Sequence, residues 1–303
     1  MKTEQIYKLF LESSGITTDS RSIGRNQIFF ALWGENFNGN KFAAEAIKKG
    51  ASWAIVDDAL YETENTILVD DCLLELQALA AHHRKQMNIP VIAITGSNGK
   101  TTTKELLAAV LAKKYVIHYT KGNLNNHIGV PLTILSAPGE TQIMIVEMGA
   151  NHIGEIRNLC HIAKPDFGII TNIGTAHIEG FGSFEGVVRA KSELYEYLKT
   201  VNGVALYNDK DQLLSEKIFR YVIRAVPFSD PTGQSLVIEQ EQPGMNLALR
   251  VRYNNECYAL KSNLFGSYNY WNIKAAIASG LFFEVPINDV ISAIEEYTPA
   301  NNR

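Results

Sequence analysis

The segment TGSNGKTT, residues 95–102, has the composition of a loop that holds phosphate groups. It follows the apolar run VIAIT and precedes a stretch that is typical of a helix. Glycines let backbone N–H groups converge on phosphate oxygens, and the start of a helix adds its dipole. Lys100 would neutralise phosphate charge and Thr101 would offer a hydroxyl to Mg²⁺. The segment therefore predicts a nucleotide-phosphate site, and the alternative is an ordinary strand–helix turn with an exposed lysine.

Further candidates lie where other apolar runs end. Glu147 closes the run QIMIVEM and could hold Mg²⁺, although a solvated carboxylate is the alternative. His177 lies in a glycine-rich loop after FGIIT, where a structural histidine is equally plausible. Lys191 is, from its local sequence, an ordinary lysine on a helix face. A polar loop at 123–127 favours a ligand contact, or simply a turn, because asparagine is common in turns.

The elements that must position these residues alternate from residue 91 onward. Nearly continuous apolar strands that alternate with helices indicate a parallel sheet covered on both faces. In such a sheet ligands bind beyond the carboxyl ends of the strands, which is where the candidates lie. Strands are expected at 91–95, 115–120, 142–148, 167–171 and 203–208, with helices after Lys100, around 153–163 and at 183–199.

The flanking regions differ in character. Residues 1 to about 85 are typical of a small α/β unit, with strands at 27–32 and 53–58 and helices at 41–51 and 72–87. Gly50 is expected to close the first of these helices. Residues 235–262 favour a short antiparallel meander joined by PGMN and NNE turns. Two helices, at 269–283 and 287–297, are expected after it.

The composition excludes several classes of protein. The chain has 303 residues, 46% of them hydrophobic and 20% charged, which is ample for packed cores. A net charge of −4 argues against a nucleic-acid partner. The sequence lacks a signal peptide and any run near the roughly 20 apolar residues of a membrane span, so a cytoplasmic location is expected. Cys72, Cys160 and Cys257 lie far apart in the sequence and are expected to be free thiols.

Six stretches occur in the order seen in the Mur ligases: TGSNGKTTT, GNLNNHIGVPLT, EMGANHIGEI, NIGTAHIEGFGS, RAKSE and GSYNYWNIKAA. Members of this family use ATP to drive amide-bond formation during cytoplasmic synthesis of peptidoglycan precursors. EMGANHIGEI and the N-terminal TTDSRSIGRNQIFFAL resemble most closely the members that join D-alanyl-D-alanine to a UDP-N-acetylmuramoyl-tripeptide. The alternatives are a ligase that adds the third peptide residue, a folylpolyglutamate synthase-like ligase, and a P-loop nucleotide switch or binding protein without ligase chemistry.

The resemblance implies a role for each matching position. The cofactors would be ATP and two Mg²⁺ ions, with a carbamate on the lysine of the RAKSE stretch. Metal ligands would be Thr101, Glu147, His177 and Lys191, and the catalytic residues Lys100, His177, Lys191 and Arg303. ATP would contact Gly96, Ser97, Asn98, Gly99, Lys100, Thr101, Thr102, Asn269 and Asn272. The UDP substrate would contact Ser20, Arg21, Phe37, Asn38, Gly39, Asn123 and Asn126.

The resemblance also implies a domain plan. Residues 1–88 would form a UDP-substrate-binding domain and 89–298 a central ATP-binding domain. Residues 299–303 would begin a linker to a C-terminal Rossmann-like domain that the chain lacks, so it is expected to bind ligands but to ligate poorly. The partners would be UDP-N-acetylmuramoyl-tripeptide and D-alanyl-D-alanine, with no nucleic acid or membrane, and the protein is expected to be a monomer.

Overall fold

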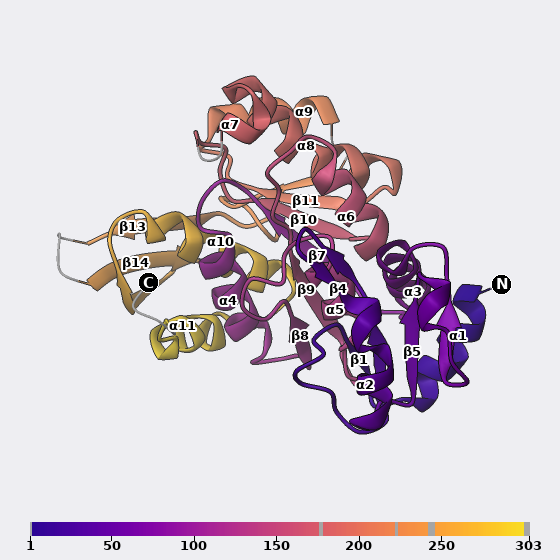
Figure 1. The fold of residues 1–303 in the computed structure, drawn as a ribbon. Coiled ribbons are helices and arrows are strands. Elements are labelled where there is room, and N and C mark those ends of the chain that lie inside the picture. The colour runs from indigo at the N-terminus through magenta and orange to yellow at the C-terminus, as the bar shows by residue number, and fades with distance from the viewer. Residues whose placement is uncertain (1, 176–177, 222–223, 242–245, 300–303) are drawn as a thin grey trace. The chain divides into compact units, whose positions relative to one another are not determined.

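The structure is a computed structural model that describes residues 2–175, 178–221, 224–241 and 246–299 (Figure 1). Internal contacts divide the chain into two compact units, and both are discontinuous in sequence. Unit 1 comprises Met1–Asn88, Lys121–Pro138 and His161–Lys164, and unit 2 comprises Ile89–Thr120, Gly139–Cys160 and Pro165–Arg303. Residues 121–138, which the sequence places within a central domain, thus group with the first 88 residues.

Unit 1 is built on a four-stranded parallel sheet with the order β1-β2-β5-β6. Phe29, Phe30 and Ile55 on the two middle strands are fully buried. Gly50 has a φ of 113°, which ends the helix before it as the sequence predicts. The strands are β1 (Ile16–Thr17), β2 (Ile28–Phe30), β5 (Trp53–Val56) and β6 (Thr66–Leu68), and the helices are α1 (Lys2–Glu12), α2 (Ala43–Lys48), α3 (Cys72–Gln86) and α5 (Gly129–Leu135).

A partly buried group of polar contacts at the end of β5 joins several segments of this unit. Asp57 accepts hydrogen bonds from Trp33 Nε1 and Asn40 Nδ2, both at 2.7 Å. It also accepts one from the backbone N–H of Cys72 at the start of α3, at 3.0 Å. Burial alone would raise the pKa of the Asp57 carboxyl, but these donors outweigh burial and lower it. The folded state therefore favours the ionised carboxylate.

We expect Asp57→Asn to lower the free energy of unfolding at pH 7 by about 2 kcal/mol, because an amide cannot accept from all three donors. The folded pKa of Asp57 is lowered, so its contribution is complete above the usual carboxyl pKa and is lost as the pH falls through the folded value. In urea denaturation, the difference in free energy of unfolding between the unaltered protein and Asp57→Asn should therefore become smaller as the pH is lowered. The exposed Asp70→Asn serves as a control that should change little. A deficit that stays constant down to pH 3 would contradict the assignment.

Unit 2 contains a six-stranded parallel sheet with the order β12-β11-β10-β7-β9-β8, and helices cover both faces (Figure 1). α4 and α10 pack on one side and α6 and α8 on the other (Figure 1). The predicted strands are confirmed to within two residues at each end. They are β7 (Val91–Thr95), β8 (Ile117–Tyr119), β9 (Ile143–Glu147), β10 (Phe167–Ile170) and β11 (Val204–Tyr207), and the sixth strand is β12 (Arg224–Pro227). The helices of the unit are α4 (Lys100–Leu111), α6 (Glu155–Ala163), α7 (Ile178–Phe181), α8 (Phe184–Thr200), α9 (Gln212–Tyr221), α10 (Asn269–Phe282) and α11 (Ile287–Glu296).

The sheet order brings the ends of three strands together. β7 lies between β9 and β10, and its five residues are all buried. The pairs Ile94–Glu147 and Thr95–Ile170 place the carboxyl ends of these strands at one edge of the sheet. Loops that follow the three strands therefore meet at this edge, as the parallel pattern predicts.

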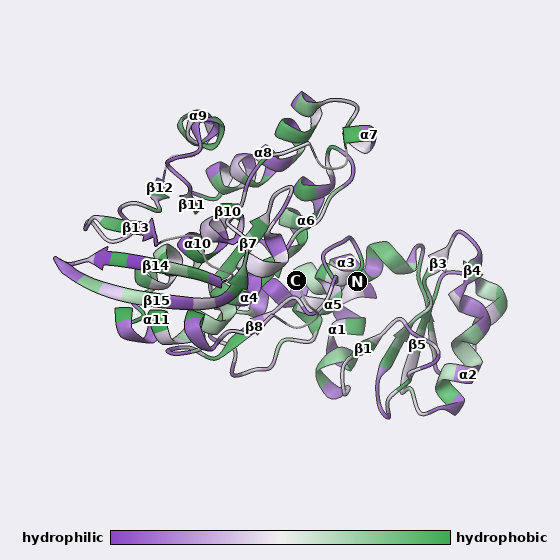
Figure 2. Ribbon diagram, turned by 90° about the vertical axis from the view of Figure 1, so that its left-hand side faces the viewer, coloured by the Kyte–Doolittle hydropathy of each residue, from purple (hydrophilic) through white to green (hydrophobic). Residues whose placement is uncertain are grey.

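The predicted antiparallel meander is also confirmed, as β13 (Leu236–Gln240), β14 (Asn246–Tyr253) and β15 (Glu256–Phe265). Along β15 the buried side chains are Leu260, Ser262 and Leu264, at alternate positions, and Figure 2 shows the change of hydropathy along these strands. Asn254 and Asn255 both have positive φ, 55° and 63°, as a two-residue hairpin turn requires. The buried face of the meander joins a hydrophobic core shared with α4, α10, α11 and β7.

Several elements lie outside the sequence prediction. The sequence assigned no regular structure to α1, α5, α7, α9, β1, β6 and β12, and it missed the short elements β3 (Trp33–Gly34), β4 (Phe37–Asn38), η1 (Gly39–Phe42) and η2 (Ala59–Tyr61). The three cysteines are free thiols, with Cys72 and Cys160 buried. Among the described residues, none of the helices combines the length and the apolar character that crossing a bilayer requires.

Candidate active site

The loop between β7 and α4 depends on two glycines with positive φ, 144° at Gly96 and 78° at Gly99. A Cβ on Gly96 would lie 2.0 Å from Thr171 Oγ1, and one on Gly99 would lie 2.3 Å from Asn272 Oδ1. Both positions therefore combine a conformation that side chains rarely adopt with a lack of space. The glycines of the predicted phosphate loop are required by its geometry.

Polar contacts fasten this loop to the segment that follows β10. Ser97 Oγ accepts from Gly174 N–H at 2.9 Å and lies 3.1 Å from Gly174 O, to which it can donate. The N–H of Asn98 donates to Asn172 Oδ1 at 3.1 Å, and its carbonyl accepts from Thr171 Oγ1 at 2.6 Å. The loop is thus held in its curved form before any ligand arrives, which is the condition for preorganised binding.

Lys100 begins α4 and folds its side chain back over the loop. Its Nζ donates to the carbonyl oxygens of Gly96 at 2.8 Å and Ser97 at 3.1 Å. Burial lowers the pKa of this amine, and the negative charge of Glu147 opposes the shift. A cation at the start of a helix, inside a glycine loop, is an arrangement that binds phosphate.

Thr101 and Glu147 form a pair of oxygen donors next to this loop. Thr101 Oγ1 donates to Glu147 Oε1 at 3.2 Å, and the Glu147 carboxylate is 1% exposed. A hydroxyl and a carboxylate side by side fit Mg²⁺, which binds proteins through one or two such ligands and takes the rest from phosphates and water. Consistent with that sparse donor set, the described residues contain no cluster of three or more metal-binding His, Cys, Asp or Glu side chains.

Lys191 lies on α8 and is almost fully buried, with 3% of its surface exposed. Burial and the charge of Lys100 lower its pKa to about 8, although Glu155 and Glu193 oppose the shift. Its Nζ lies 5.5 Å from the centre of the Phe181 ring. The local prediction of an ordinary surface lysine is therefore wrong, because tertiary packing covers this face of α8.

Asn269 and Asn272 form a short hydrogen-bonded chain beside the loop. Asn272 accepts from Thr103 Oγ1 at 3.1 Å and donates to Asn269 Oδ1 at 2.8 Å. Asn269 in turn donates to Phe265 O at 2.8 Å. Both side chains are buried, so the contact of these two residues with a nucleotide base stays a prediction.

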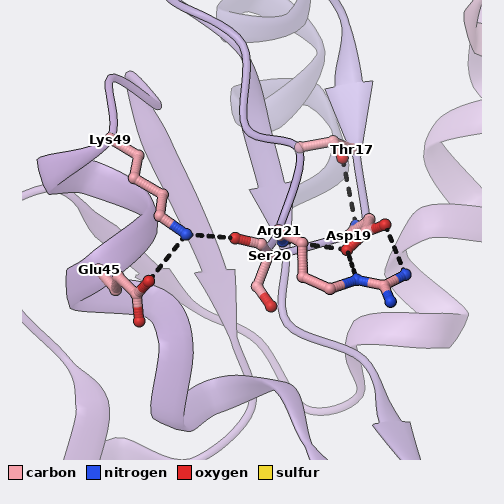
Figure 3. A network of polar contacts seen from close by, with 6 residues as sticks. All are labelled: Thr17, Asp19, Ser20, Arg21, Glu45 and Lys49. Atoms are coloured by element: carbon pink, nitrogen blue, oxygen red, sulfur yellow. Dashed lines mark hydrogen bonds and ion pairs between the residues drawn. The ribbon is translucent and has the colours of Figure 1, made fainter.

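In unit 1, the segment Asp19–Arg21 is held by contacts on both sides (Figure 3). Arg21 makes two hydrogen bonds of 2.9 Å to the Asp19 carboxylate, and this contact lowers the pKa of Asp19 to about 2. Lys49 Nζ donates to Ser20 O at 2.9 Å and pairs with Glu45 at 2.7 Å. The exposed guanidinium of Arg21 is thereby oriented, with its charge paired to Asp19, and a contact of Ser20 and Arg21 with the UDP substrate stays a prediction.

The aromatic and glycine candidates follow in the hairpin of β3 and β4. The Phe37 ring is 45% exposed and stacks on Phe42, with 5.2 Å between ring centres. Asn38 Oδ1 accepts from Asn40 N–H at 2.9 Å and caps η1. Gly39 lies so close to Leu32 that a Cβ would be 2.5 Å from its carbonyl oxygen. An exposed flat ring beside this tight turn is a surface on which a base or a sugar could pack.

In the polar loop at 123–127, the side chain of Asn126 stabilises the start of the following helix. Asn126 Oδ1 accepts from the N–H groups of Ile128 and Gly129, at 3.1 and 2.9 Å, and so caps α5. Asn123 accepts from Asn125 N–H through its carbonyl at 2.7 Å. A role for Asn123 and Asn126 in ligand contact stays a prediction. The candidates His177 and Arg303 lie outside the described residues.

One residue of the site was missed from the sequence. Lys104, on α4, is almost completely buried, and its Nζ lies 3.4 Å from Glu147 Oε2. The available signal was its position four residues after Lys100, because residues at i and i+4 share one face of a helix. Nothing in the local pattern indicates that this lysine is buried.

Two family descriptions match the chain. The Mur ligase middle domain matches residues 94–280, which contain the phosphate loop, Glu147, Lys191 and both asparagines of α10. The description "Mur ligase family, catalytic domain" matches residues 12–121. Together these matches span both units.

Similar proteins agree with these matches. The UDP-N-acetylmuramoyl-tripeptide–D-alanyl-D-alanine ligase of Bacillus subtilis is 36% identical over 92% of this chain and 61% of its own length. Crystal structures of MurF from Acinetobacter baumannii and of MurF from Thermotoga maritima in complex with ADP have TM-scores of 0.85 and 0.83, at 34% and 26% identity. They cover 95% and 96% of this chain, which spans 64% and 67% of theirs. The phosphate-loop geometry, the family matches and these relatives lead to one conclusion: the chain belongs to the Mur ligase family.

Proposed function

We propose that this chain serves in ATP-dependent amide ligation, in which D-alanyl-D-alanine is joined to a UDP-N-acetylmuramoyl-tripeptide. The observation that carries the proposal is the preorganised glycine loop with Lys100 inside it and the oxygens of Thr101 and Glu147 beside it. The choice of substrates is supported by the name of the Bacillus subtilis relative. We further propose a cytoplasmic monomer without nucleic-acid or membrane partners.

In the proposed first step, the terminal carboxylate of the tripeptide attacks the γ-phosphorus of ATP. The bond to the β-phosphate oxygen breaks, which yields an acyl phosphate and ADP. In the second step the amine of D-alanyl-D-alanine attacks the acyl carbon, the new C–N bond forms, phosphate leaves and the amine loses a proton. A carboxylate and a triphosphate repel one another, so the site must above all neutralise charge.

The residues of unit 2 are suited to that task. Lys100 supplies a cation at the loop, and the N–H groups of the first turn of α4 point toward the same place. Thr101 and Glu147 would hold Mg²⁺, which when bound supplies further positive charge to the phosphates. We propose His177 and Lys191 as ligands toward a second ion, and Arg303 as a further contact to the γ-phosphate.

A carbamate on Lys191 is the chemical form that would make this lysine a metal ligand. The neutral amine attacks CO₂, an N–C bond forms and one proton is released, so the cation becomes an anion. The lowered pKa of about 8 leaves more neutral amine near physiological pH than an ordinary lysine has. Carbon-13 NMR in ¹³C-bicarbonate should show a carbamate signal that Lys191→Gln lacks.

Calorimetry and a turnover assay test the proposed function. The chain is titrated with a nonhydrolysable ATP analogue and Mg²⁺, and separately with UDP-N-acetylmuramoyl-tripeptide. We expect both to bind. Phosphate release that requires both the tripeptide and D-alanyl-D-alanine would support the full reaction for a protein that contains this chain.

Other outcomes of these titrations favour other functions. Binding of the nucleotide without the UDP-tripeptide would overturn the substrate assignment and favour a nucleotide switch. A preference for UDP-N-acetylmuramoyl-dipeptide over the tripeptide would indicate a ligase that adds the third residue. Failure of both ligands to bind would contradict the proposal for this chain.

A further inference from the structure

We infer that Lys104 is a positioning residue, which holds the Glu147 carboxylate so that one of its oxygens faces Thr101 and the phosphate loop. The inference rests on the proposed function, because it concerns the carboxylate that would hold Mg²⁺. Lys104 does not touch the ligand in this account. It acts through Glu147.

The two oxygens of Glu147 have different neighbours. Oε1 accepts a hydrogen bond from Thr101 at 3.2 Å, and Oε2 lies 3.4 Å from Lys104 Nζ. The contact with the lysine is an ion pair rather than an aligned hydrogen bond. One oxygen is thus directed toward the start of α4, while the other is turned toward the buried ammonium.

The burial of this ion pair explains why its geometry is strict. The side chains of Lys104 and Glu147 are each 1% exposed. Removing two charges from water is costly, and the cost is offset only where the charges face one another closely. A rotation of Glu147 away from Lys104 would leave a buried ammonium and a buried carboxylate apart. The carboxylate is therefore confined to the orientation in which Oε1 meets Thr101.

The backbone provides a second reason why the Glu147 carboxylate keeps this orientation. The N–H of Glu147 donates to Thr120 Oγ1 at 3.0 Å, so the strand end itself is fixed. Lys104 lies three residues after Thr101 on α4, and the two side chains reach the same carboxylate from one face of the helix. The helix thus determines both the hydroxyl and the ammonium that flank Glu147.

A second carboxylate, that of Glu105, lies near the same ammonium. Glu105 Oε1 lies 3.9 Å from Lys104 Nζ, and Glu105 Oε2 accepts a hydrogen bond of 2.6 Å from Tyr297 Oη. Tyr297 directly follows α11. The orientation of the metal-binding carboxylate is therefore linked to the end of that helix.

Lys104→Met tests the inference, since methionine keeps most of the length of the side chain and removes its charge. The complex with a nonhydrolysable ATP analogue is titrated with Mn²⁺, and binding of the metal is followed by electron paramagnetic resonance. We expect the Mn²⁺ concentration for half-saturation to rise about tenfold in Lys104→Met. Nucleotide binding without metal should change less than about twofold. A purely structural role would reduce the folded fraction but would not shift the metal midpoint of the protein that remains folded.

Lys274→Met is the matched control, because Lys274 is 4% exposed and lies over the Trp271 ring rather than beside Glu147. The Mn²⁺ concentration for half-saturation of this variant, its metal midpoint, should stay within about twofold of that of the unaltered protein. In a Glu147→Gln background, Lys104→Met should cause no additional shift, because the residue through which it acts has been neutralised.

The possible outcomes separate the inference from the proposed function. If the unaltered protein binds no metal–nucleotide complex, the proposed function fails. If it binds and Lys104→Met leaves the metal midpoint within twofold, the inference is overturned. Should Lys104→Met not fold, Glu105→Gln takes its place. That variant is expected to raise the midpoint about two- to threefold, and an unchanged midpoint would likewise overturn the inference.

Discussion

Replacing Lys100 by alanine should weaken binding of an ATP analogue by about 100-fold or more, as is typical when a charge-stabilising group is removed from a preorganised site. In the structure the Lys100 ammonium lies on the carbonyl oxygens of Gly96 and Ser97. Without that ammonium, the phosphates would approach two carbonyl dipoles and the nearby Glu147 carboxylate. No positive side chain at the loop would then offset their repulsion. Calorimetric titration in constant Mg²⁺ measures the effect.

A lysine just beyond the other end of α4 provides the control. Lys113 lies just after the helix and pairs with the exposed Glu296 at 2.8 Å. Lys113→Ala removes the same side chain at the far end of the helix and should leave the affinity within about twofold. The thermal midpoints of both variants should remain near that of the unaltered protein. An affinity of Lys100→Ala within threefold of the original would show that the loop does not bind phosphate.

Gly96→Ala should lower the free energy of unfolding by about 3 kcal/mol or more, as the sum of backbone strain and overpacking. The φ of 144° is one that alanine rarely adopts. The new Cβ would also lie 2.0 Å from Thr171 Oγ1 and 3.1 Å from Asn172 O. The Thr171 hydroxyl is itself hydrogen-bonded to Asn98 O, so it cannot move without breaking the loop's own contact. Urea denaturation measures the loss.

Gly233→Ala separates the two contributions. Gly233 has a φ of 81°, but no atom lies within 4 Å of the position of its Cβ. This variant should therefore show only the cost of the backbone conformation, about 1 kcal/mol. If both variants lose the same stability, the crowding at Gly96 contributes nothing, and the loop is less tightly closed than the structure indicates.

The sequence was most informative where local and global signals agree. VIAIT is fully apolar and is followed by Gly96, so both the strand and its end at Thr95 could be predicted. α5 was missed because its sequence GVPLTIL contains Pro131, which usually argues against a helix. Pro131 occupies the first turn, where its missing N–H costs no hydrogen bond. The capping by Asn126 was the available signal.

For the candidate site, the sequence indicated which residues lie at the edge of the sheet but not their burial. That Thr101 meets Glu147 follows from the parallel sheet, since β7 and β9 are neighbours. The burial of Lys104 and Lys191 could not be predicted, because it depends on side chains that arrive from distant segments of the chain. Periodicity assigns lysines to the surface by default, and only tertiary contacts override that assignment.

The central position of β7 also bears on how the chain folds. β7 pairs only with strands made later, β9 and β10, and its pairing with β10 joins Thr95 to Ile170. During synthesis β9 is complete at residue 147, but the phosphate loop lacks its second flanking strand, β10, until residue 170 has left the ribosome. Contacts between such distant segments slow folding, because the chain must close large loops before the contacts stabilise it. We infer that nascent chains ending before β10 leave the edge of β7 that pairs with it exposed, which makes this interval the one in which the protein is most prone to aggregate.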